Sequence, residues 1–352
     1  MSKDPHIIDL PKKVVVGTNV IDRIPEILME LGLHHKAHII TGPTVKGIVG
    51  EYMSSLLSEK GIPNELSTAK SSFLHDVEEV LEEVKRSMPT VIIGLGGGKS
   101  IDTAKYVSSH LYIPFISVPT AASHDGIASP FASIRGLNRI TSIKAAPPVA
   151  IVADLSVISQ APPRLLKAGA GDLIGKFTAV LDWRLAHRLK GEYYGEYAAS
   201  LSLLSAKHVM NATEIIATGG KAAASLIIEG LVSSSVAMCI AGSSRPASGS
   251  EHLFSHALDK VANYPALHGE QVAVGTILMT YLHGRNWKLL RARMRKMGLP
   301  TTAKELGVRD VDVIEALTIA HKIRPERYTI LGESGLTYEA AEELARTTGV
   351  ID

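Results

Sequence analysis

At 352 residues the chain is longer than an average domain and long enough for two, so a two-lobed globular protein is expected. A net charge of +2 with scattered basic residues argues against a nucleic-acid-binding surface, so any anionic partner is expected to be small. The single cysteine excludes an internal disulfide, and residues 1–12 lack the apolar stretch of a secretory signal. These features predict a cytoplasmic protein. The longest apolar run, residues 222–241, is interrupted by Glu229 and three serines, so it predicts a buried helix and no membrane insertion.

Short β-branched segments alternate with helical patterns up to about residue 158. Strands separated by amphipathic helices are typical of parallel βαβ units. Residues 73–86, for example, place apolar side chains at helical spacing and leave an acidic face exposed. The first half is therefore predicted to be an α/β domain with a Rossmann-like, doubly wound sheet. Its strands are expected at residues 14–17, 38–41, 91–94, 115–118 and 149–152.

The pattern changes after Pro162 and Pro163. From there to the C-terminus the chain carries long helical segments rich in Ala, Leu, Ser and Met, so the second half is predicted to be all-α. Domain boundaries of 1–160 and 161–352 follow. Within the first half, residues 133–144 predict a β-hairpin, because Gly136 and Asn138 suit its turn.

A glycine-rich loop follows the strand expected at 91–94. Residues 94–98 contain four glycines and lead into a helix expected to start near Ser100. Glycine allows the backbone N–H groups and the helix N-terminus to approach an anion, and a nucleotide pyrophosphate is the natural ligand. Neither familiar phosphate loop matches: Ile93 stands at the first glycine of a Walker loop, and Lys99 at the last glycine of G-x-G-x-x-G.

The helical half carries residue types that bind metals. Asp172 lies among glycines, His252 and His256 are four residues apart, and His268 precedes a glycine. One carboxylate and two imidazoles would leave a coordination position vacant, as in catalytic zinc sites, so Zn²⁺ is the expected metal. Leu253 stands where a zinc protease would have its glutamate, which excludes that class.

Two segments carry a resemblance to a known superfamily. The string GGGKSIDTAK (96–105) resembles the cofactor loop of the superfamily that contains iron-type alcohol dehydrogenases, glycerol dehydrogenase and dehydroquinate synthase. PTAASHDGIASP (119–130) resembles its second cofactor loop. The resemblance implies a dehydroquinate synthase-like fold that binds NAD(H) or NADP(H). The implied cofactor contacts are Gly97, Gly98, Lys99, Ser100, Ile101, Asp102, Thr120, Ala121, Ala122, Ser123 and Ser129. Asp102 has an alternative role, stabilising the first turn of its helix by its charge.

The same resemblance implies roles in the helical half. Asp172, His252 and His268 match the positions that bind the metal, with one Zn²⁺ expected per subunit. His256 is expected beside the substrate as a proton relay or substrate contact, and Asp125 is expected to face the substrate. Asp125, Asp172 and His256 are therefore the expected catalytic and substrate-binding residues. The first domain would bind the dinucleotide, and the second the metal and substrate.

Within the superfamily, segments 119–130, 168–177 and 249–259 most closely resemble the sn-glycerol-1-phosphate dehydrogenases. This implies metal-assisted reduction of dihydroxyacetone phosphate by NAD(P)H to sn-glycerol 1-phosphate, the backbone of archaeal membrane ether lipids. The strand at 38–41 is not followed by the acidic residue that selects NAD, so NADH and NADPH both remain open. The phosphate of the triose needs a cation, and spacing does not choose among Lys144, Arg245 and Lys260.

Three other functions remain as alternatives. Glycerol dehydrogenase would act on unphosphorylated glycerol or dihydroxyacetone, and dehydroquinate synthase would need a larger basic cluster for its substrate. A nucleotide-binding sensor that lost catalysis would usually have lost a metal ligand. A homo-oligomer is expected, without a fixed number of subunits.

Overall fold

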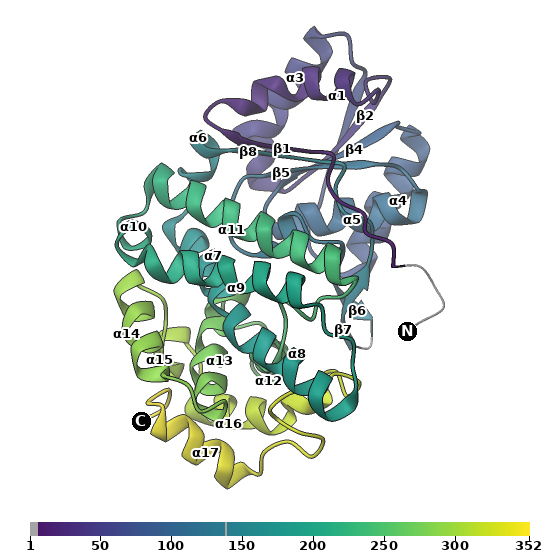
Figure 1. Ribbon diagram of the computed structural model, residues 1–352. Helices are drawn as coiled ribbons and strands as arrows, with labels where there is room; N and C mark the ends of the chain where they lie inside the picture. The colour runs from purple at the N-terminus through teal and green to yellow at the C-terminus, as the bar shows by residue number, and fades with distance from the viewer. Residues whose placement is uncertain (1–5, 138) are drawn as a thin grey trace. The chain divides into compact units, whose positions relative to one another are not determined.

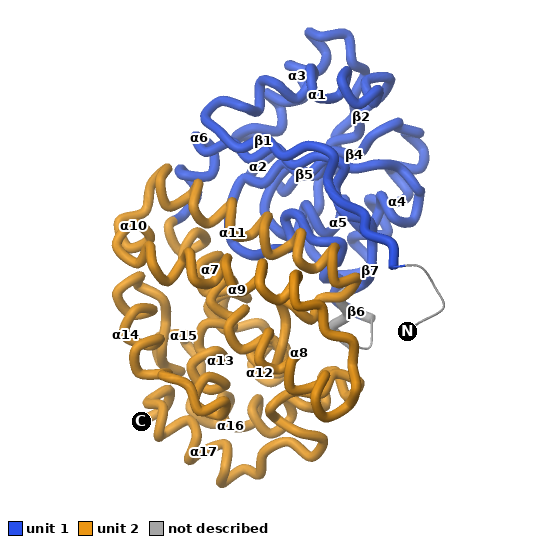
Figure 2. Tube along the Cα trace, in the orientation of Figure 1, with its two compact units in different colours: residues 1–162 blue, residues 163–352 orange. Residues whose placement is uncertain are grey.

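The computed structural model describes residues 6–137 and 139–352, and the chain divides into two compact units, residues 1–162 and 163–352 (Figures 1 and 2). The division lies next to the boundary at 160/161 expected from the sequence. Each unit has its own secondary structure and apolar core, and each is described by itself below.

Unit 1 contains a parallel six-stranded sheet with the strand order β1-β8-β5-β4-β2-β3. Strands β2, β4, β5 and β8 are buried throughout, which explains why they appear in the sequence as nearly continuous apolar runs. The strands are β1 (Lys13–Gly17), β2 (Ala37–Thr41), β3 (Asn64–Thr68), β4 (Val91–Gly96), β5 (Phe115–Pro119) and β8 (Ala150–Asp154).

Helices cover both faces of this sheet, as predicted for a doubly wound fold. Ile93 packs in one apolar cluster with side chains of α1 and α3. The next residue, Gly94, points to the opposite face, where a Cβ would lie 2.8 Å from the Cβ of Ala104 on α5. The helices of this unit are η1 (Val20–Arg23), α1 (Ile24–Glu30), α2 (Pro43–Val45), η2 (Lys46–Gly50), α3 (Glu51–Glu59), α4 (Leu74–Ser87), α5 (Gly98–Leu111), η3 (Asp125–Ile127) and α6 (Leu155–Ile158).

One strand of the sheet was not predicted. Strand β3 has the sequence NELST, which lacks an apolar run because the strand lies at the sheet edge and is only partly buried. The predicted hairpin is confirmed: β6 (Phe131–Leu137) pairs antiparallel with β7 (Arg139–Lys144). Gly136 has a φ of 88°, while Asn138, the other expected turn residue, lies outside the described residues.

Unit 2 is entirely helical, as predicted. Trp183 is fully buried against alanines of neighbouring helices, so small residues allow these helices to pack closely. Helix α11 is long and apolar enough to cross a membrane, but 67% of its most apolar window is buried, as expected for an interior helix. The helices are α7 (Pro163–Ile174), α8 (Lys176–Lys190), α9 (Glu196–Asn211), α10 (Thr213–Thr218), α11 (Gly220–Ala241), α12 (Ser250–Ala262), α13 (His268–Leu282), α14 (Trp287–Met297), α15 (Ala303–Leu306), α16 (Asp310–Ile319), η4 (Ala320–Lys322) and α17 (Tyr338–Thr347).

Candidate functional site

The glycine-rich loop lies where the strand order of the sheet reverses. From β2 the chain continues to β3 on one side, whereas β4 pairs with the other side of β2. The carboxyl ends of β2 and β4 are therefore adjacent, and a Cβ at Gly42 would lie 3.5 Å from the Oγ of Ser100. Doubly wound sheets bind ligands at this position.

The backbone of the loop leaves room for an anion. Gly96 has a φ of 147°, and a Cβ there would lie 2.7 Å from the Oγ of Ser100, so only glycine fits. A Cβ on Gly97, by contrast, would meet nothing within 4 Å. Helix α5 starts directly after Gly97 without a side-chain cap, so its first N–H groups face this open space. These features fit a dinucleotide pyrophosphate.

The helix begins at Gly98, not near Ser100 as predicted. Asp102 consequently lies beyond the first turn, and the expectation that it stabilises that turn by its charge is wrong. Its Oδ1 instead accepts a hydrogen bond of 3.2 Å from the Nζ of Lys105. Only 5% of Asp102 is exposed, so this ion pair is internal.

Lys105 connects the two predicted cofactor loops. Its fully buried Nζ donates to Asp102 and also, at 2.6 Å each, to the carbonyl oxygens of Gly126 and Phe131. A second connection is the hydrogen bond of 3.0 Å from the Thr120 N–H to the Gly96 carbonyl. The structure thus brings together the two loops that the sequence proposed.

His124 is a residue of the second loop that the sequence did not single out. A Cβ on Gly98 would lie 1.9 Å from its Nε2, so the ring covers that glycine, and its Nδ1 accepts a hydrogen bond from the Gly126 N–H. A histidine within a polar loop gives no sequence signal for this contact.

The other predicted cofactor and substrate residues of unit 1 differ in exposure. Ser129 turns inward, since it is 2% exposed and its Oγ donates to the Phe131 carbonyl at 3.3 Å. Lys99 donates to the Lys70 carbonyl at 2.8 Å. Their contacts with a cofactor or substrate remain predictions. Ser100, Ile101, Ala121 and Ala122 are buried, whereas Ser123 and Asp125 are half-buried.

Unit 2 brings the three predicted metal ligands together. One ligand atom from each of Asp172, His252 and His268 lies within 4.8 Å of the other two. The Oδ1 of Asp172 is 3.3 Å from the Nε2 of His252 and 4.0 Å from the Nε2 of His268. A divalent ion with bonds of about 2 Å can bridge donors at this spacing.

Glycines allow the helices that carry these ligands to approach. A Cβ on Gly171 of α7 would lie 2.2 Å from the Gly269 carbonyl oxygen, and a Cβ on Gly269 of α13 would lie 1.9 Å from the Ala168 carbonyl oxygen. Each glycine directly neighbours a predicted ligand, Asp172 or His268. The close crossing of α7 and α13 therefore sets the distance between these two side chains.

The first imidazole is oriented by a carboxylate. Glu251 is fully buried, and its Oε1 accepts a hydrogen bond of 2.8 Å from the Nδ1 of His252. Burial alone would raise the pKa of Glu251, but hydrogen bonds and charge from its surroundings lower it, so it is ionised. With its proton on Nδ1, His252 presents the lone pair of Nε2 to the cluster, the arrangement typical of metal-bound histidines.

The second imidazole is oriented by a neutral hydrogen-bond chain. The Oγ of Ser255 donates to the Oε1 of Gln271 at 2.7 Å, so toward the Nδ1 of His268, at 3.2 Å, it is an acceptor. His268 thus also carries its proton on Nδ1 and leaves Nε2 for a metal. The sequence did not identify Ser255 or Gln271, because only the packing of α12 on α13 brings them to His268. Glu251 was not identified either, although it directly precedes His252.

A buried cation lies beside the carboxylate of the cluster. Lys176 is fully buried, and its Nζ donates to the Oδ1 of Asp172 and to the Ala247 carbonyl, both at 3.2 Å. Burial would raise the pKa of Asp172, but the charge of Lys176 and the interaction with His252 outweigh it and keep this pKa well below its usual range. The ionised carboxylate and two correctly oriented imidazoles fit a divalent metal.

His256 lies next to the cluster without belonging to it. Its ring stacks on that of His268 with 5.6 Å between centroids. Burial, then the charges of neighbouring cationic groups, hold the pKa of His256 well below its usual range. Its buried Nδ1 has no hydrogen-bond partner among the described residues. A pKa held this low makes the ring a weak base, and the role of His256 as proton relay or substrate contact stays a prediction.

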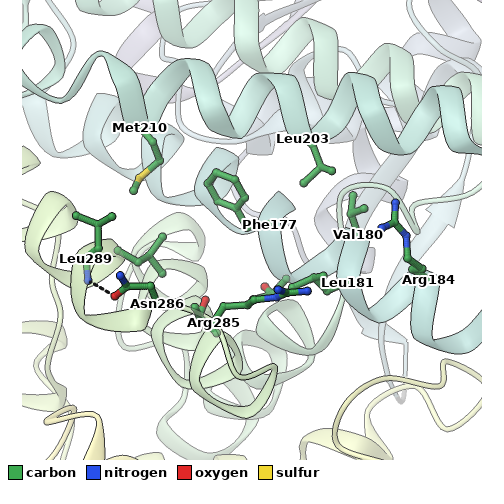
Figure 3. Close-up of a pocket in the computed structure, with 12 residues that line it drawn as sticks. Phe177, Val180, Leu181, Arg184, Leu203, Met210, Arg285, Asn286 and Leu289 are labelled. Carbon is green, nitrogen blue, oxygen red and sulfur yellow. Dashed lines mark hydrogen bonds between the residues drawn. The ribbon is translucent and has the colours of Figure 1, made fainter.

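A separate apolar pocket in unit 2 contains none of the predicted site residues (Figure 3). It has a volume of about 320 Å³, and Phe177, Leu181, Met210 and Leu289 are among the apolar residues that line it. Polar residues, including Arg184, Arg285 and Asn286, also line it, but its exposed surface is almost entirely apolar.

Comparison with known proteins defines the class of this fold. Residues 15–162 match the family model described as iron-containing alcohol dehydrogenase. The fold is similar to that of glycerol dehydrogenase from Schizosaccharomyces pombe, which is 22% identical with a TM-score of 0.80 over 99% of this chain and 91% of that one. It is also similar to a butanol dehydrogenase from Thermotoga maritima, 18% identical with a TM-score of 0.76 over 98% of each chain. The fold is therefore that of the iron-containing alcohol dehydrogenases.

Closer relatives narrow the class. A protein of Hyperthermus butylicus is 57% identical over 98% of this chain and 99% of its own, and one of Staphylothermus marinus is 55% identical over the full length of both. Both are named glycerol-1-phosphate dehydrogenase, with NAD(P)+ in the name. The chain belongs to the glycerol-1-phosphate dehydrogenase family.

Proposed function

We propose that this chain reduces dihydroxyacetone phosphate to sn-glycerol 1-phosphate with NADH or NADPH. The observation that carries the proposal is the cluster of Asp172, His252 and His268 in a chain that shares 57% of its residues with a glycerol-1-phosphate dehydrogenase. The product would supply the glycerophosphate backbone of archaeal membrane ether lipids.

The residues of unit 1 would bind the dinucleotide. The open space above Gly97 and the uncapped N–H groups of α5 suit the pyrophosphate. Thr120 and Ser123 of the second loop would contact the same cofactor, and the buried Lys105 holds both loops in place. The chain after β2 continues with Gly42 and Pro43, so it offers no carboxylate that would repel the 2′-phosphate of NADPH.

The residues of unit 2 would bind the metal and the reacting end of the substrate. When bound, the metal supplies a Lewis acid for the ketone oxygen, and the dinucleotide supplies the hydride. Glu251 and Ser255 hold the two imidazoles with Nε2 toward the cluster. His256 would relay the proton that the product hydroxyl requires, accepting one from solvent at one ring nitrogen as the other nitrogen releases one. Asp125 would contact the substrate from its own loop.

Zinc is the metal we propose. One carboxylate and two imidazoles with a vacant position match catalytic zinc sites, while the same donor set also suits ferrous iron. To distinguish zinc from ferrous iron, the metal-free protein is reloaded with each ion and its activity is measured. Higher activity with iron than with zinc at equal occupancy would contradict the assignment.

The setting of the enzyme is also part of the proposal. We place it in the cytoplasm, as the sequence predicts. We propose a homo-oligomer, because helix α9 leaves Tyr197 72% exposed and Leu204 61% exposed. Light scattering on the purified chain would measure the number of subunits.

The decisive experiment is a rate measurement with purified protein. NADH and NADPH oxidation is followed with dihydroxyacetone phosphate, before chelation, after it and after zinc repletion, and each enantiomer of glycerol phosphate is tested in reverse. Zinc-restored activity confined to the 1-phosphate enantiomer is the expected result. A preference for unphosphorylated glycerol or dihydroxyacetone would overturn the substrate assignment and leave the metal centre in place.

A further inference from the structure

Three arginines gather in unit 2 on two segments that are far apart in the sequence. Arg245 lies in the loop 242–249 between α11 and α12, and Arg324 and Arg327 lie in the segment 323–337 before α17 (Figure 1). The two segments are in contact, because Arg327 donates to the Ser248 carbonyl at 2.6 Å and to the Oγ of Ser244 at 2.7 Å.

The charges of these arginines are compensated unequally. Arg245 is 4% exposed, and its guanidinium forms a two-point pair with Glu192 and donates to the Tyr328 carbonyl. Arg324 and Arg327 form no ion pair with a carboxylate in the part of the chain that the structure describes. Burial, then the positive charges of Arg324 and Arg245, lower the pKa of Arg327 to about 9. Two guanidinium groups therefore lie close together without a directly paired carboxylate, although Glu192 and Glu326 are near enough to oppose part of the shift at Arg327.

Both unpaired arginines remain accessible to a small ion. Their side chains are half-buried, whereas a structural arginine such as Arg245 is enclosed. A half-buried guanidinium group can still be reached by a small anion. A charge-assisted hydrogen bond to it is strong, because little water competes for the charge.

The arginines lie beside the proposed metal centre. The Ala247 carbonyl accepts a hydrogen bond from Lys176, which also binds the ligand Asp172, and the next carbonyl, that of Ser248, accepts one from Arg327. The adjacent residues Ala247 and Ser248 thus connect Arg327, through Lys176, to the carboxylate of Asp172.

We propose that Arg324 and Arg327 bind the phosphate group of the substrate. Two forked guanidinium groups match the two negative charges and the oxygen geometry of a phosphate monoester dianion, whereas a single carboxylate would balance only one of them. Arg245 is a positioning residue, which holds Tyr328 and Glu192 behind the pair. This assignment rests on the proposed function, since it supposes a phosphorylated substrate at the metal centre.

The assignment differs from the three cations that the sequence suggested. Lys144 and Lys260 are exposed, and Arg245 is already paired with Glu192. The sequence gives no signal for Arg324 and Arg327, because nothing in the local sequence IRPERY distinguishes them from surface arginines.

The test compares a phosphorylated with an unphosphorylated substrate. R324Q, R327Q and R327K are assayed in the metal-loaded enzyme with dihydroxyacetone phosphate and with dihydroxyacetone, and R309Q serves as a control that removes an exposed arginine paired with Asp312. Inorganic phosphate is used as a probe, as a competitive inhibitor and by calorimetry. We expect kcat/KM for the phosphorylated substrate to fall about 10- to 100-fold in R324Q and R327Q, with a parallel loss of phosphate affinity. Activity with dihydroxyacetone should stay within about twofold, and R327K should lie between R327Q and wild type.

Several results would overturn the proposal. One is unchanged phosphate affinity in folded R324Q and R327Q. Another is an equal loss with both substrates in R324Q and R327K, because a phosphate contact cannot serve a substrate that has no phosphate. Failure of the proposed function is a different observation, namely that the wild type does not reduce dihydroxyacetone phosphate. Calorimetry with inorganic phosphate still decides in that case whether the arginines form an anion site.

Discussion

The two units build their proposed sites from different materials. In unit 1 the site is made of backbone: Gly96 and Gly97 lie in the space that a pyrophosphate would approach, and the N-terminus of α5 offers its N–H groups. In unit 2 the site is made of side chains from three helices, two of them buried and His268 half-buried, each held by a partner of its own. A backbone site is damaged by adding atoms, whereas a side-chain site is damaged by removing them or by separating the helices.

The largest effect is expected from removing a metal ligand. His252→Ala should abolish stoichiometric metal binding and lower the reduction rate by about 1000-fold or more, because Lewis-acid stabilisation contributes several kcal/mol. Metal content and initial rates measure both. The matched control is His256→Ala, one turn further along α12, which should keep the metal. If His256→Ala lost the metal and His252→Ala kept it, the ligand set would be wrong.

A methyl group added at the crossing of α7 and α13 should lower activity nearly as much as removing a ligand, although it contacts none of the ligands. In Gly269→Ala the added Cβ would lie 1.9 Å from the Ala168 carbonyl oxygen, so α13 must move and carry His268 away from Asp172. We expect activity to fall about 100-fold, as for a catalytic group displaced by about 1 Å, and the unfolding temperature to fall. Gly47→Ala is the control, because a Cβ there meets nothing within 4 Å. Equal behaviour of the two variants would contradict the crossing argument.

Replacing the carboxylate behind His252 should have an intermediate effect. Glu251→Gln keeps the shape and an acceptor for the Nδ1 of His252 but removes the charge, so metal affinity should fall about 10- to 100-fold. Competition with a chelator measures it. Ser255→Ala, behind His268, removes only a neutral acceptor and should cost less, about 2- to 10-fold. A larger loss of metal affinity in Ser255→Ala than in Glu251→Gln would mean that His268 contributes more to metal binding than His252.

In unit 1, where the proposed site is made of backbone, the matching test adds a side-chain atom to the glycine-rich loop. Gly97→Ala places a methyl group in the open space of the loop, and its φ of −80° suits alanine, so the fold should tolerate it. Dinucleotide affinity should fall on the order of tenfold, the usual cost of crowding a close contact. Fluorescence titration with NADPH and a melting curve measure the two quantities. An unchanged affinity would place the pyrophosphate elsewhere.

The smallest expected effect is on pH stability and involves His38 of β2. Its Nε2 donates to the Oγ of Ser67, which itself donates to Glu83, and its buried Nδ1 has no partner among the described residues. Burial lowers the pKa of His38, with Lys36 acting in the same direction and the charges of Glu65 and Glu83 opposing it.

The folded state therefore favours neutral His38. As the pH falls below about 6.5, the unfolded chain binds a proton that the folded chain does not, so the free energy of unfolding decreases by at most about 1.4 kcal/mol per pH unit. This contribution is present above pH 6.5 and is lost toward acid. His38→Gln should flatten the acid limb of a urea-denaturation series, and a limb as steep as that of the wild type would rule the mechanism out.

The contrast between the units also explains which parts of the fold and of the site could be predicted from the sequence. The sheet, the helical half and the glycine loop follow from local patterns, and only strand β3 was missed, because an edge strand needs no apolar run. The ligands Asp172, His252 and His268 were named through a resemblance, and the structure brings them together. Glu251 and Lys176 lie one and four residues from the ligands that they contact, but no motif marked them as supports. Arg324 and Arg327 reach this region only through packing of distant segments, which leaves no periodic trace in the chain.

The glycines at the crossing of α7 and α13 also serve as a marker in related sequences. Gly171 and Gly269 have no chemistry of their own, but a Cβ at either would push α7 and α13 apart and lengthen the distance between Asp172 and His268. A relative that had abandoned its metal could acquire alanine at either position before any ligand changed. The two glycines therefore offer an early sign of whether a distant family member still depends on its metal.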